Sequence, residues 1–376
     1  MSVYLDNAAT TKPCAEAVSA AVDAMTDNYG NPSSLHRAGL DAQLAMDSAR
    51  KIIASSIGAD SSELYFTSGA TESNNLALRG ASAAYGKKRR KIVISAVEHA
   101  SVDETAAALE KNGFEVTRVS PREDGRFYAE DFVSACDDET CLISVMLVNN
   151  ETGCIMPVKE TFSAIKRHFS DIITHCDCVQ GYMKLPVKAA ALHADLISLS
   201  AHKIHGVKGV GALYIRRGVR VLPIVTGGKQ EKGVRSGTES VPLIAAFGAA
   251  AQKLRPTISE RYARAQELKA HLLGRLAEIG DISVNSPDDG SPYVINISAG
   301  GKRSEIMLHF LESRGICVSS GSACSKGQQS GVLGQFGITG KRADSALRIS
   351  ITAETTEAEL DALCAALREG MEKVRG

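Results

Sequence analysis

The sequence lacks the features that direct a chain to a membrane or out of the cell. Its start, Met1–Asp6, has neither the basic residues nor the apolar run of a signal peptide, and no apolar stretch elsewhere approaches membrane-spanning length. It also lacks net charge, because 43 lysines and arginines balance 43 aspartates and glutamates. We therefore expect a soluble, cytoplasmic protein without direct contact to nucleic acid or membrane, whose partners are small molecules or proteins.

The cysteine spacing of a disulfide framework or a zinc site is lacking too. The nine cysteines are an odd number and are scattered along the chain. We expect reduced thiols, mostly buried, and no metal site. Cys176 and Cys178 flank Asp177 and should pack on the face opposite to it if the strand continues. Cys317 lies in an apolar run, which favours burial.

What the sequence does contain, up to about Pro256, is an alternation of short apolar runs with amphipathic helical patterns. This alternation is typical of a mainly parallel sheet covered by helices on both faces. In such a sheet ligands bind beyond the carboxyl ends of the strands. The predicted strands include Ile92–Ser95, Phe114–Val116, Leu142–Met146, Ile172–His175 and Leu196–Ser198, and the predicted helices include Ser101–Lys111 and Val158–His168.

After Pro256 the pattern changes to that of a smaller α+β unit. The whole chain has 376 residues, which is long enough for two cores. We therefore predict a large domain over residues 14–257 and a small domain formed by residues 1–13 and 258–376. The predicted elements of the second are helices Ser259–Ile279, Ser304–Ser313 and Glu357–Lys373 and strands Val294–Ile297, Ile316–Ser319 and Leu347–Ile351.

Four strand ends carry groups that together suit pyridoxal phosphate. This cofactor requires an amine for its aldehyde, an anion facing its ring nitrogen, a planar group over the ring and donors for its phosphate. Lys203 lies just past an apolar strand, Asp177 ends another with Gln180 three residues on, and His99 follows a third. Phe66–Asn75 is read as a strand end, a tight turn and a helix start, whose free amides could hold the phosphate.

Each of these groups alone has an ordinary explanation. A lysine beside glycines is usually a solvated surface residue. A strand-end aspartate commonly caps a helix, and a single histidine or Gly-Ala-Thr turn is weak evidence of a cofactor. Only the presence of all four groups at strand ends favours the cofactor.

Eight short motifs are spread over nearly the whole chain: Tyr4–Thr11, Gly30–Ser34, Thr67–Ser73, Glu98–His99, Val148–Glu151, His202–Lys203, Arg235–Thr238 and Ser319–Cys324. Together they resemble the cysteine desulfurases of the NifS/IscS-like branch, which are class V aminotransferase-like, fold-type I pyridoxal-phosphate enzymes. The resemblance implies an α/β fold with a large, mainly parallel seven-stranded sheet and a smaller α+β domain. It also implies that sulfur is removed from L-cysteine, giving L-alanine and an enzyme-bound persulfide.

The same resemblance implies a role for each site residue. Lys203 would bind the cofactor as a Schiff base and act as a base, while His99 would stack on the ring and move protons. Arg348 would bind the substrate carboxylate, a geometry that lysine would not reproduce, although an exposed arginine is usually just a surface ion pair. The other expected contacts are Asp177, Gln180 and Asn150 at the ring, Ala70, Thr71, Ser200 and His202 at the phosphate, and Thr238 at the phosphate of a neighbouring subunit, which implies a homodimer.

Cys324 is the expected sulfur acceptor. It lies in a stretch rich in glycine, serine and glutamine from residue 319 to about 331, which favours a mobile loop over the buried position usual for a free cysteine. In the implied mechanism its thiolate attacks the substrate sulfur and passes the persulfide to an acceptor protein, an iron–sulfur scaffold or a tRNA-thiolation enzyme. A transient iron–sulfur contact at Cys324 is the one metal contact that the resemblance allows.

Other functions remain open at this point. A selenocysteine lyase, or another lyase or transaminase of the same fold, would use Lys203 and Asp177 equally, although transaminases need no thiol. A noncatalytic sulfur carrier or scaffold could keep the fold, but loss of a reactive residue would then be expected. The sequence ends soon after its last helix, without the longer tail with which housekeeping members engage an iron–sulfur scaffold, so the acceptor is left open.

Overall fold

A seven-stranded sheet is the largest element of the computed structural model, which describes residues 2–320 and 331–374. The strand order is β2-β8-β7-β6-β5-β3-β4, and only β8 runs antiparallel to its neighbours. The prediction of a mainly parallel sheet is therefore confirmed. The strands are β2 (Leu64–Thr67), β3 (Lys91–Ser95), β4 (Glu115–Val119), β5 (Thr140–Ser144), β6 (Ile173–Asp177), β7 (Leu196–Ser200) and β8 (Gly211–Ile215).

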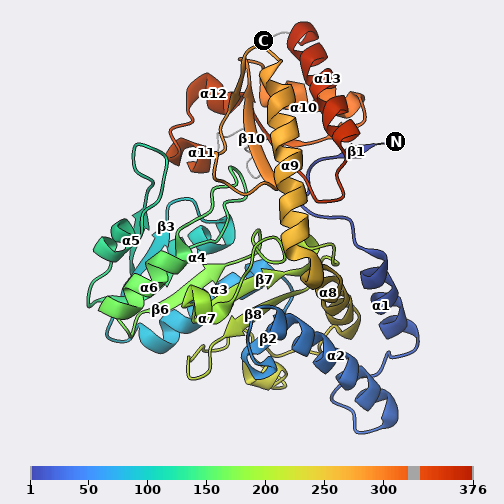
Figure 1. Ribbon diagram of the computed structural model, residues 1–376. Coiled ribbons are helices and arrows are strands. Elements are labelled where there is room, and N and C mark those ends of the chain that lie inside the picture. The colour runs from blue at the N-terminus through green and yellow to red at the C-terminus, as the bar shows by residue number, and fades with distance from the viewer. Residues whose placement is uncertain (1, 321–330, 375–376) are drawn as a thin grey trace.

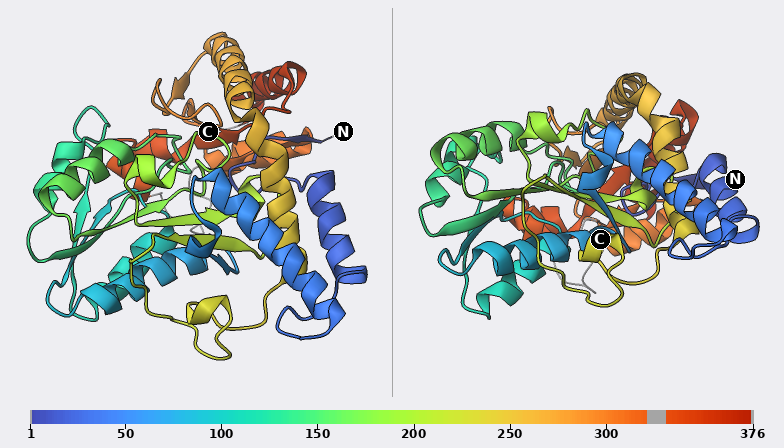
Figure 2. Two further views of the ribbon diagram at one scale, coloured as in Figure 1. Left: turned by 60° about the horizontal axis from the view of Figure 1, so that its bottom comes forward. Right: turned by 90° about the horizontal axis from the view of Figure 1, so that it is seen from below.

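Helices cover both faces of this sheet (Figure 2). On one face α3 (Ala70–Tyr85) and α4 (Ala100–Glu110) share a buried apolar cluster with the strands. A second cluster fills the other face, and burial on both faces explains why the strands read as continuous apolar runs. The helices of the second cluster are α1 (Ala15–Thr26), α2 (Arg37–Ser56), α5 (Ala129–Ala135), α6 (Val158–His168), α7 (Ala189–Leu192) and α8 (Val241–Leu254).

A smaller unit lies above the sheet in Figure 1, and the long helix α9 (Ile258–Ala277) runs up to it. It contains a four-stranded sheet of order β12-β13-β10-β9 and the strand pair β1-β11, and Leu5 belongs to its separate core. The exact domain boundaries stay predictions. The elements are β1 (Val3–Tyr4), β9 (Ile282–Val284), β10 (Val294–Ala299), α10 (Ser304–Ser313), β11 (Ile316–Cys317), β12 (Ser319–Ser320), α11 (Gly331–Gln335), α12 (Gly340–Asp344), β13 (Ala346–Ser350) and α13 (Glu357–Lys373).

The predicted single strand over residues 316–319 is wrong, because the chain changes partners there. β11 pairs in parallel with β1, whereas β12 pairs antiparallel with β13. Ile316 joins the core of the small unit, and the alternation of strand side chains turns Cys317 the other way. Cys317 is therefore only half-buried, contrary to the prediction.

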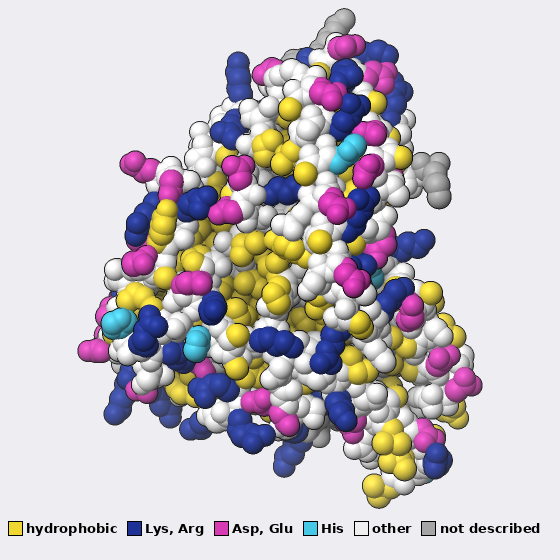
Figure 3. Space-filling view, in the orientation of Figure 1, with side chains coloured by type: hydrophobic (Ala, Val, Ile, Leu, Met, Phe, Trp, Pro, Cys, Tyr) yellow, Lys and Arg dark blue, Asp and Glu magenta, His cyan; other side chains and the backbone are white. Residues whose placement is uncertain are grey.

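Charged side chains of both signs are interspersed over the molecular surface seen in Figure 3, as expected for a chain without net charge. Short 3₁₀ helices complete the structure: η1 (Ser61–Glu63), η2 (Ala201–Lys203), η3 (Glu231–Gly233) and η4 (Arg255–Thr257). Within the described residues, every helix is too short or too polar to cross a membrane.

Candidate functional site

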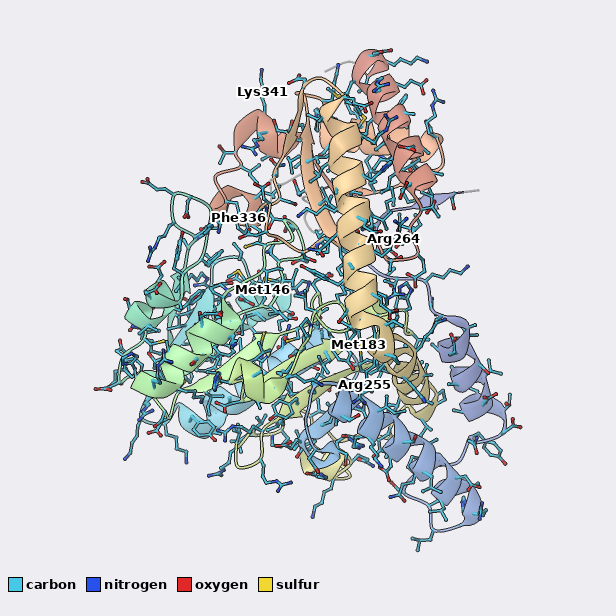
Figure 4. The ribbon with its side chains drawn as sticks, in the orientation of Figure 1. Met146, Met183, Arg255, Arg264, Phe336 and Lys341 are labelled. Atoms are coloured by element: carbon cyan, nitrogen blue, oxygen red, sulfur yellow. The ribbon has the colours of Figure 1, made fainter. Side chains whose placement is uncertain are left out.

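A cavity of about 630 Å³ lies where the carboxyl ends of the large sheet face the small unit. Met146, just past β5, also lines it and lies between the sheet and the upper unit in Figure 4. Because parallel strands end at one edge of a sheet, residues far apart in sequence meet there. The expected site residues that line this cavity are Ala70, Thr71, His99, Asn150, Asp177, Gln180, Ser200, His202, Lys203 and Arg348.

Two expected residues are not among these. Thr238 is exposed and lines a hollow of about 130 Å³ that adjoins the cavity, since both are lined by Ser68, Gly209 and Val210. Cys324 lies outside the described residues, as does most of the segment around it. The roles assigned to both stay predictions.

The expected phosphate site is the N-terminus of α3. No side chain caps this helix, so its first amides are not satisfied by a capping group, and such amides favour an anion. Glu72 in the first turn would oppose an anion, but its carboxylate accepts a hydrogen bond from the Ser68 amide at 2.6 Å and pairs with Arg235 at 2.8 Å. Gly211 of β8 lies against the preceding turn, where a Cβ would come 2.7 Å from a backbone carbon of Gly69.

A chain of hydrogen bonds links Asp177 to His99. The Asn74 amide donates to Oδ2 of Asp177 and to Oγ of Ser101, each at 2.8 Å. Ser101 Oγ lies 2.8 Å from Nδ1 of His99, and the Ser101 backbone amide donates to the same nitrogen at 3.1 Å. Since Nδ1 accepts, the proton of a neutral His99 ring is on Nε2.

Lys203 is held by the N-terminal segment of the chain. Its ammonium donates to the carbonyl oxygens of Ala8 and Ala9, at 2.8 Å for the latter, and Gln180 Nε2 donates to Ala8 O at 2.9 Å. Nδ1 of the adjacent His202 lies 3.3 Å from Oγ1 of Thr10. Burial, followed by the charges of Lys203 and two other lysines, lowers the pKa of His202 to about 4, so this ring is neutral at pH 7.

Arg348 is a buried residue, 7% exposed. It does form an ion pair, with Asp6 at 2.9 Å, but not at the surface as the ordinary explanation requires. A second donor, Nη1, contacts the Asn150 carbonyl at 3.1 Å. Its Nε atom is buried without a partner among the described residues, which leaves the guanidinium with a donor to satisfy.

The cysteines beside Asp177 pack as expected. Cys176 and Cys178 are fully buried in the core, and their sulfur atoms lie 3.4 Å apart. Of the eight described cysteines only Cys14 and Cys317 are partly exposed. None of these eight lines the cavity.

Sequence reasoning assigned no role to Asn74, Ser101 or Glu98. Asn74 and Glu98 belong to motifs noted in the sequence, but their contacts depend on residues from other strands. Glu98 is buried, and its Oε1 accepts hydrogen bonds from Ser95 Oγ at 2.5 Å and from the Met146 amide at 2.8 Å. Its Oε2 has no partner among the described residues. Burial raises the pKa of Glu98 to about 8.

Comparison with known proteins places this chain among relatives of one family. The family model described as Aminotransferase class-V matches residues 3–363. The mitochondrial cysteine desulfurase of Eremothecium gossypii is 39% identical over 99% of this chain and 76% of its own, and the cysteine desulfurase IscS of Methanosarcina thermophila is 37% identical over 100% and 93%.

Solved structures agree with these relatives. A NifS-like protein superposes with a TM-score of 0.94 at 34% identity and covers 99% of this chain and 100% of its own. SspA in complex with cysteine superposes with a TM-score of 0.83 at 32% identity and covers 94% of this chain and 99% of its own.

The raised pKa of Glu98 predicts a pH-dependent stability. Below about pH 4.5 the folded and unfolded states both carry the proton, but between there and about pH 8 only the unfolded state loses it, so stability falls as pH rises. Glu98→Gln cannot ionise. As the pH rises, the free energy of unfolding of Glu98→Gln should therefore increase relative to that of wild type by up to about 1.4 kcal/mol per pH unit. The difference should be on the order of 3 kcal/mol at pH 7.

Urea unfolding of both proteins at pH 5, 6 and 7 measures this difference. Glu104→Gln, which changes an exposed glutamate of α4, is the control and should differ from wild type by less than about 0.5 kcal/mol throughout. A difference between Glu98→Gln and wild type that stays constant from pH 5 to 7 would contradict a buried, protonated Glu98.

Proposed function

This chain belongs to the class V aminotransferase family and to its NifS/IscS-like cysteine desulfurase branch, and we propose that it takes the sulfur from L-cysteine with pyridoxal phosphate as its cofactor. The observation that carries the proposal is the single cavity that gathers Lys203, Asp177, His99 and Arg348. An amine, a buried carboxylate, an imidazole and a guanidinium meet there on four different segments of the chain. The solved structure of the related SspA with cysteine supports the choice of substrate.

The residues present fit this cofactor. The volume of about 630 Å³ is within the range of small-molecule sites. The uncapped first turn of α3, with Ala70 and Thr71, would bind the phosphate together with Ser200 and His202. Asp177 would bind the protonated ring nitrogen, while Gln180 and Asn150 would face the ring hydroxyl and His99 would lie over the ring.

When bound, the cofactor supplies an electron-withdrawing ring that stabilises negative charge developing beside the substrate α-carbon. Asp177 is held for its part by Asn74 Nδ2 and by the Val179 amide at 3.0 Å. Lys203 Nζ would take the α-proton and return one to the product. Nε2 of His99 would donate a hydrogen bond to a reacting group and take part in moving protons.

Arg348 would orient the substrate by its carboxylate. Asp6 and the Asn150 carbonyl already hold two of its nitrogens, so the guanidinium loses little freedom when a ligand arrives. A substrate carboxylate would compete with Asp6 or share the guanidinium with it. Either contact would hold L-cysteine in the cavity that Lys203 also lines.

Cys324 would receive the sulfur. Its thiolate attacks the sulfur of L-cysteine, an S–S bond forms, and the C–S bond of the substrate breaks. L-Cysteine plus the Cys324 thiol give L-alanine plus a Cys324 persulfide, so atoms and electrons balance without another oxidant. Ser319, five residues before Cys324 in the sequence, lines the cavity and pairs with Arg348.

The working unit would be a homodimer. Thr238 is not among the residues that line the cavity of its own chain and would contact the phosphate bound by the partner. Hydrophobic side chains are exposed on the α1–α2 projection, at the lower right of Figure 3, where an interface would cover them. They include Val18, Val22, Met25, Leu35, Leu40 and Leu44.

The persulfide would pass to an acceptor protein that serves iron–sulfur cluster assembly or tRNA thiolation. Reductants cleave a persulfide, so in a reducing compartment its sulfur is preserved by direct transfer from one protein to the next. The buried cysteines of this chain, which form no disulfide among the described residues, suit such a compartment. We place the protein in the cytoplasm on this ground.

The activity test is the release of alanine and sulfide from L-cysteine in the presence of a reductant. Lys203→Ala should lose activity by at least about 100-fold because it lacks the attachment point and the base. Cys324→Ala should lose it to a similar extent while keeping its coloured cofactor. Cys317→Ala changes a half-buried thiol outside the cavity and should react like wild type. Sulfide release by Cys324→Ala at the wild-type rate would overturn the role of Cys324.

Mixed dimers test the position of Thr238. If Thr238 acts across the interface, a dimer of one Lys203→Ala chain and one Thr238→Val chain has one intact site and about half of the wild-type activity. A dimer of one wild-type chain and one chain with both changes then has none. If Thr238 acts within its own chain, the two results are exchanged.

Light scattering should give about 80 kDa, twice the 39.8 kDa of one chain.

A further inference from the structure

Lys184 is a buried amine for which the mechanism above has no role. It is 9% exposed and follows Met183, which lies close to the base of α9 in Figure 4. Within residues 2–320 and 331–374 its ammonium makes one hydrogen bond, to Oε1 of Gln180 at 3.1 Å, and no ion pair. Burying an ammonium without a carboxylate costs stability, so this residue calls for an explanation.

The charges around Lys184 do not compensate for this cost. Burial, followed by the positive charges of Lys203 and Arg348, lowers the pKa of Lys184 to about 7. Arg261, which lines the small cavity beside Lys184, is paired with Glu354. The titratable side chains that line the small cavity beside Lys184 are Lys203 and His205 near η2, Arg261 of α9 and Tyr293 before β10, whose ring centre is 5.7 Å from the ammonium.

What Lys184 does contact is the carboxamide of Gln180. An ammonium can only donate, so the oxygen end of the amide must face Lys184. On the other side Ala8 presents a carbonyl oxygen, which can only accept, 2.9 Å from the nitrogen end. The two neighbours therefore require the same orientation of the amide, in which the NH₂ group faces the cavity that Gln180 lines.

Among the residues that the structure describes, the second hydrogen of this NH₂ group has no acceptor. Ala8 O takes one N–H of Gln180 and also accepts from Lys203, so the amide nitrogen lies next to the reactive amine. A group bound to Lys203 would meet the second N–H. Without Lys184 only the Ala8 carbonyl would hold this orientation, and an amide that turned over would present its oxygen, which would repel an oxygen of that group.

We propose that Lys184 is a positioning residue, which orients Gln180 so that a hydrogen-bond donor faces the ring oxygen of the cofactor bound to Lys203. This inference rests on the proposed function. A donor at that oxygen and a nearby positive charge both disfavour a proton on the nitrogen of Lys203. Loss of Lys184 should therefore make that nitrogen more basic.

The cofactor itself reports this change, because its absorbance changes when the nitrogen bound to it is protonated. In the purified holoenzyme, titrated from pH 5 to 10, the midpoint for Lys184→Met should lie about one pH unit above that of wild type, which is about tenfold in proton affinity. Methionine fills a similar volume without a charge, so the variant should be at least as stable as wild type in urea.

Lys188→Met is the matched control. Lys188 is four residues further along the chain, just before α7, exposed, and donates to the Ser56 carbonyl at 3.0 Å, away from the cavity. Its titration midpoint should equal that of wild type. A midpoint for Lys184→Met that matches Lys188→Met would overturn the proposal even if both variants release alanine normally.

A double variant tests the route through Gln180. Gln180→Ala alone should raise the midpoint, and adding Lys184→Met should then raise it by less than Lys184→Met does in wild type, because only the charge of Lys184 and not its hold on Gln180 is lost. Shifts that add would show that Lys184 acts without Gln180 and would contradict the proposal. If wild type binds no coloured cofactor at all, the proposed function fails and this inference fails with it.

Discussion

The carbonyl oxygen of Ala8 accepts hydrogen bonds from Gln180 and Lys203 at once, and the geometry of the whole site depends on this junction. The N-terminal segment that presents it is tied at both ends. Asn7 donates to the Ser350 carbonyl of the small unit at 2.9 Å, and Thr11 donates to the His202 carbonyl beside the large sheet at 2.9 Å. A shift of the small unit would therefore move the atoms that hold the reactive amine.

The charges of the cavity suit an anionic ligand. Of its three carboxylates, Asp6 and Glu72 are each paired with an arginine, which leaves Asp177 for a cation such as a protonated ring nitrogen. Lys203 and Lys208 line the same cavity. Bringing cations into a partly buried space costs free energy that a phosphate or a carboxylate can offset, so the site favours ligands that carry both. Lys184 adds a further positive charge behind Gln180, which lines the cavity.

Much of this arrangement could be predicted from the sequence, because local patterns determine it. The predicted bounds of α6, α10 and α13 match the structure, and α13 begins with a capping box between Thr356 and Glu359. Asp177, His99 and Lys203 could be placed together because parallel strands share a carboxyl edge. The relatives confirm the family that the motifs indicated.

Contacts between distant segments could not be predicted. Gln180 and Ala8 are 172 positions apart, and nothing local to Lys184 shows that its amine is buried against Gln180. The change of partners between β11 and β12 likewise depends on β1 at the other end of the chain. The hydrogen bond between Asn74 and Ser101 could not be predicted either, because it joins two helices and spans 27 positions of the sequence.

The transfer of one sulfur atom to one thiol is the central claim, and mass spectrometry tests it most directly. The holoenzyme is incubated with L-cysteine without a reductant, digested, and the peptide that contains Cys324 is compared with the same peptide from untreated protein. The account predicts a gain of one sulfur atom on Cys324, about 32 Da from the balance of the thiol and persulfide, with one alanine released per subunit. Alanine release with an unmodified Cys324, or the added sulfur on another cysteine, would contradict it.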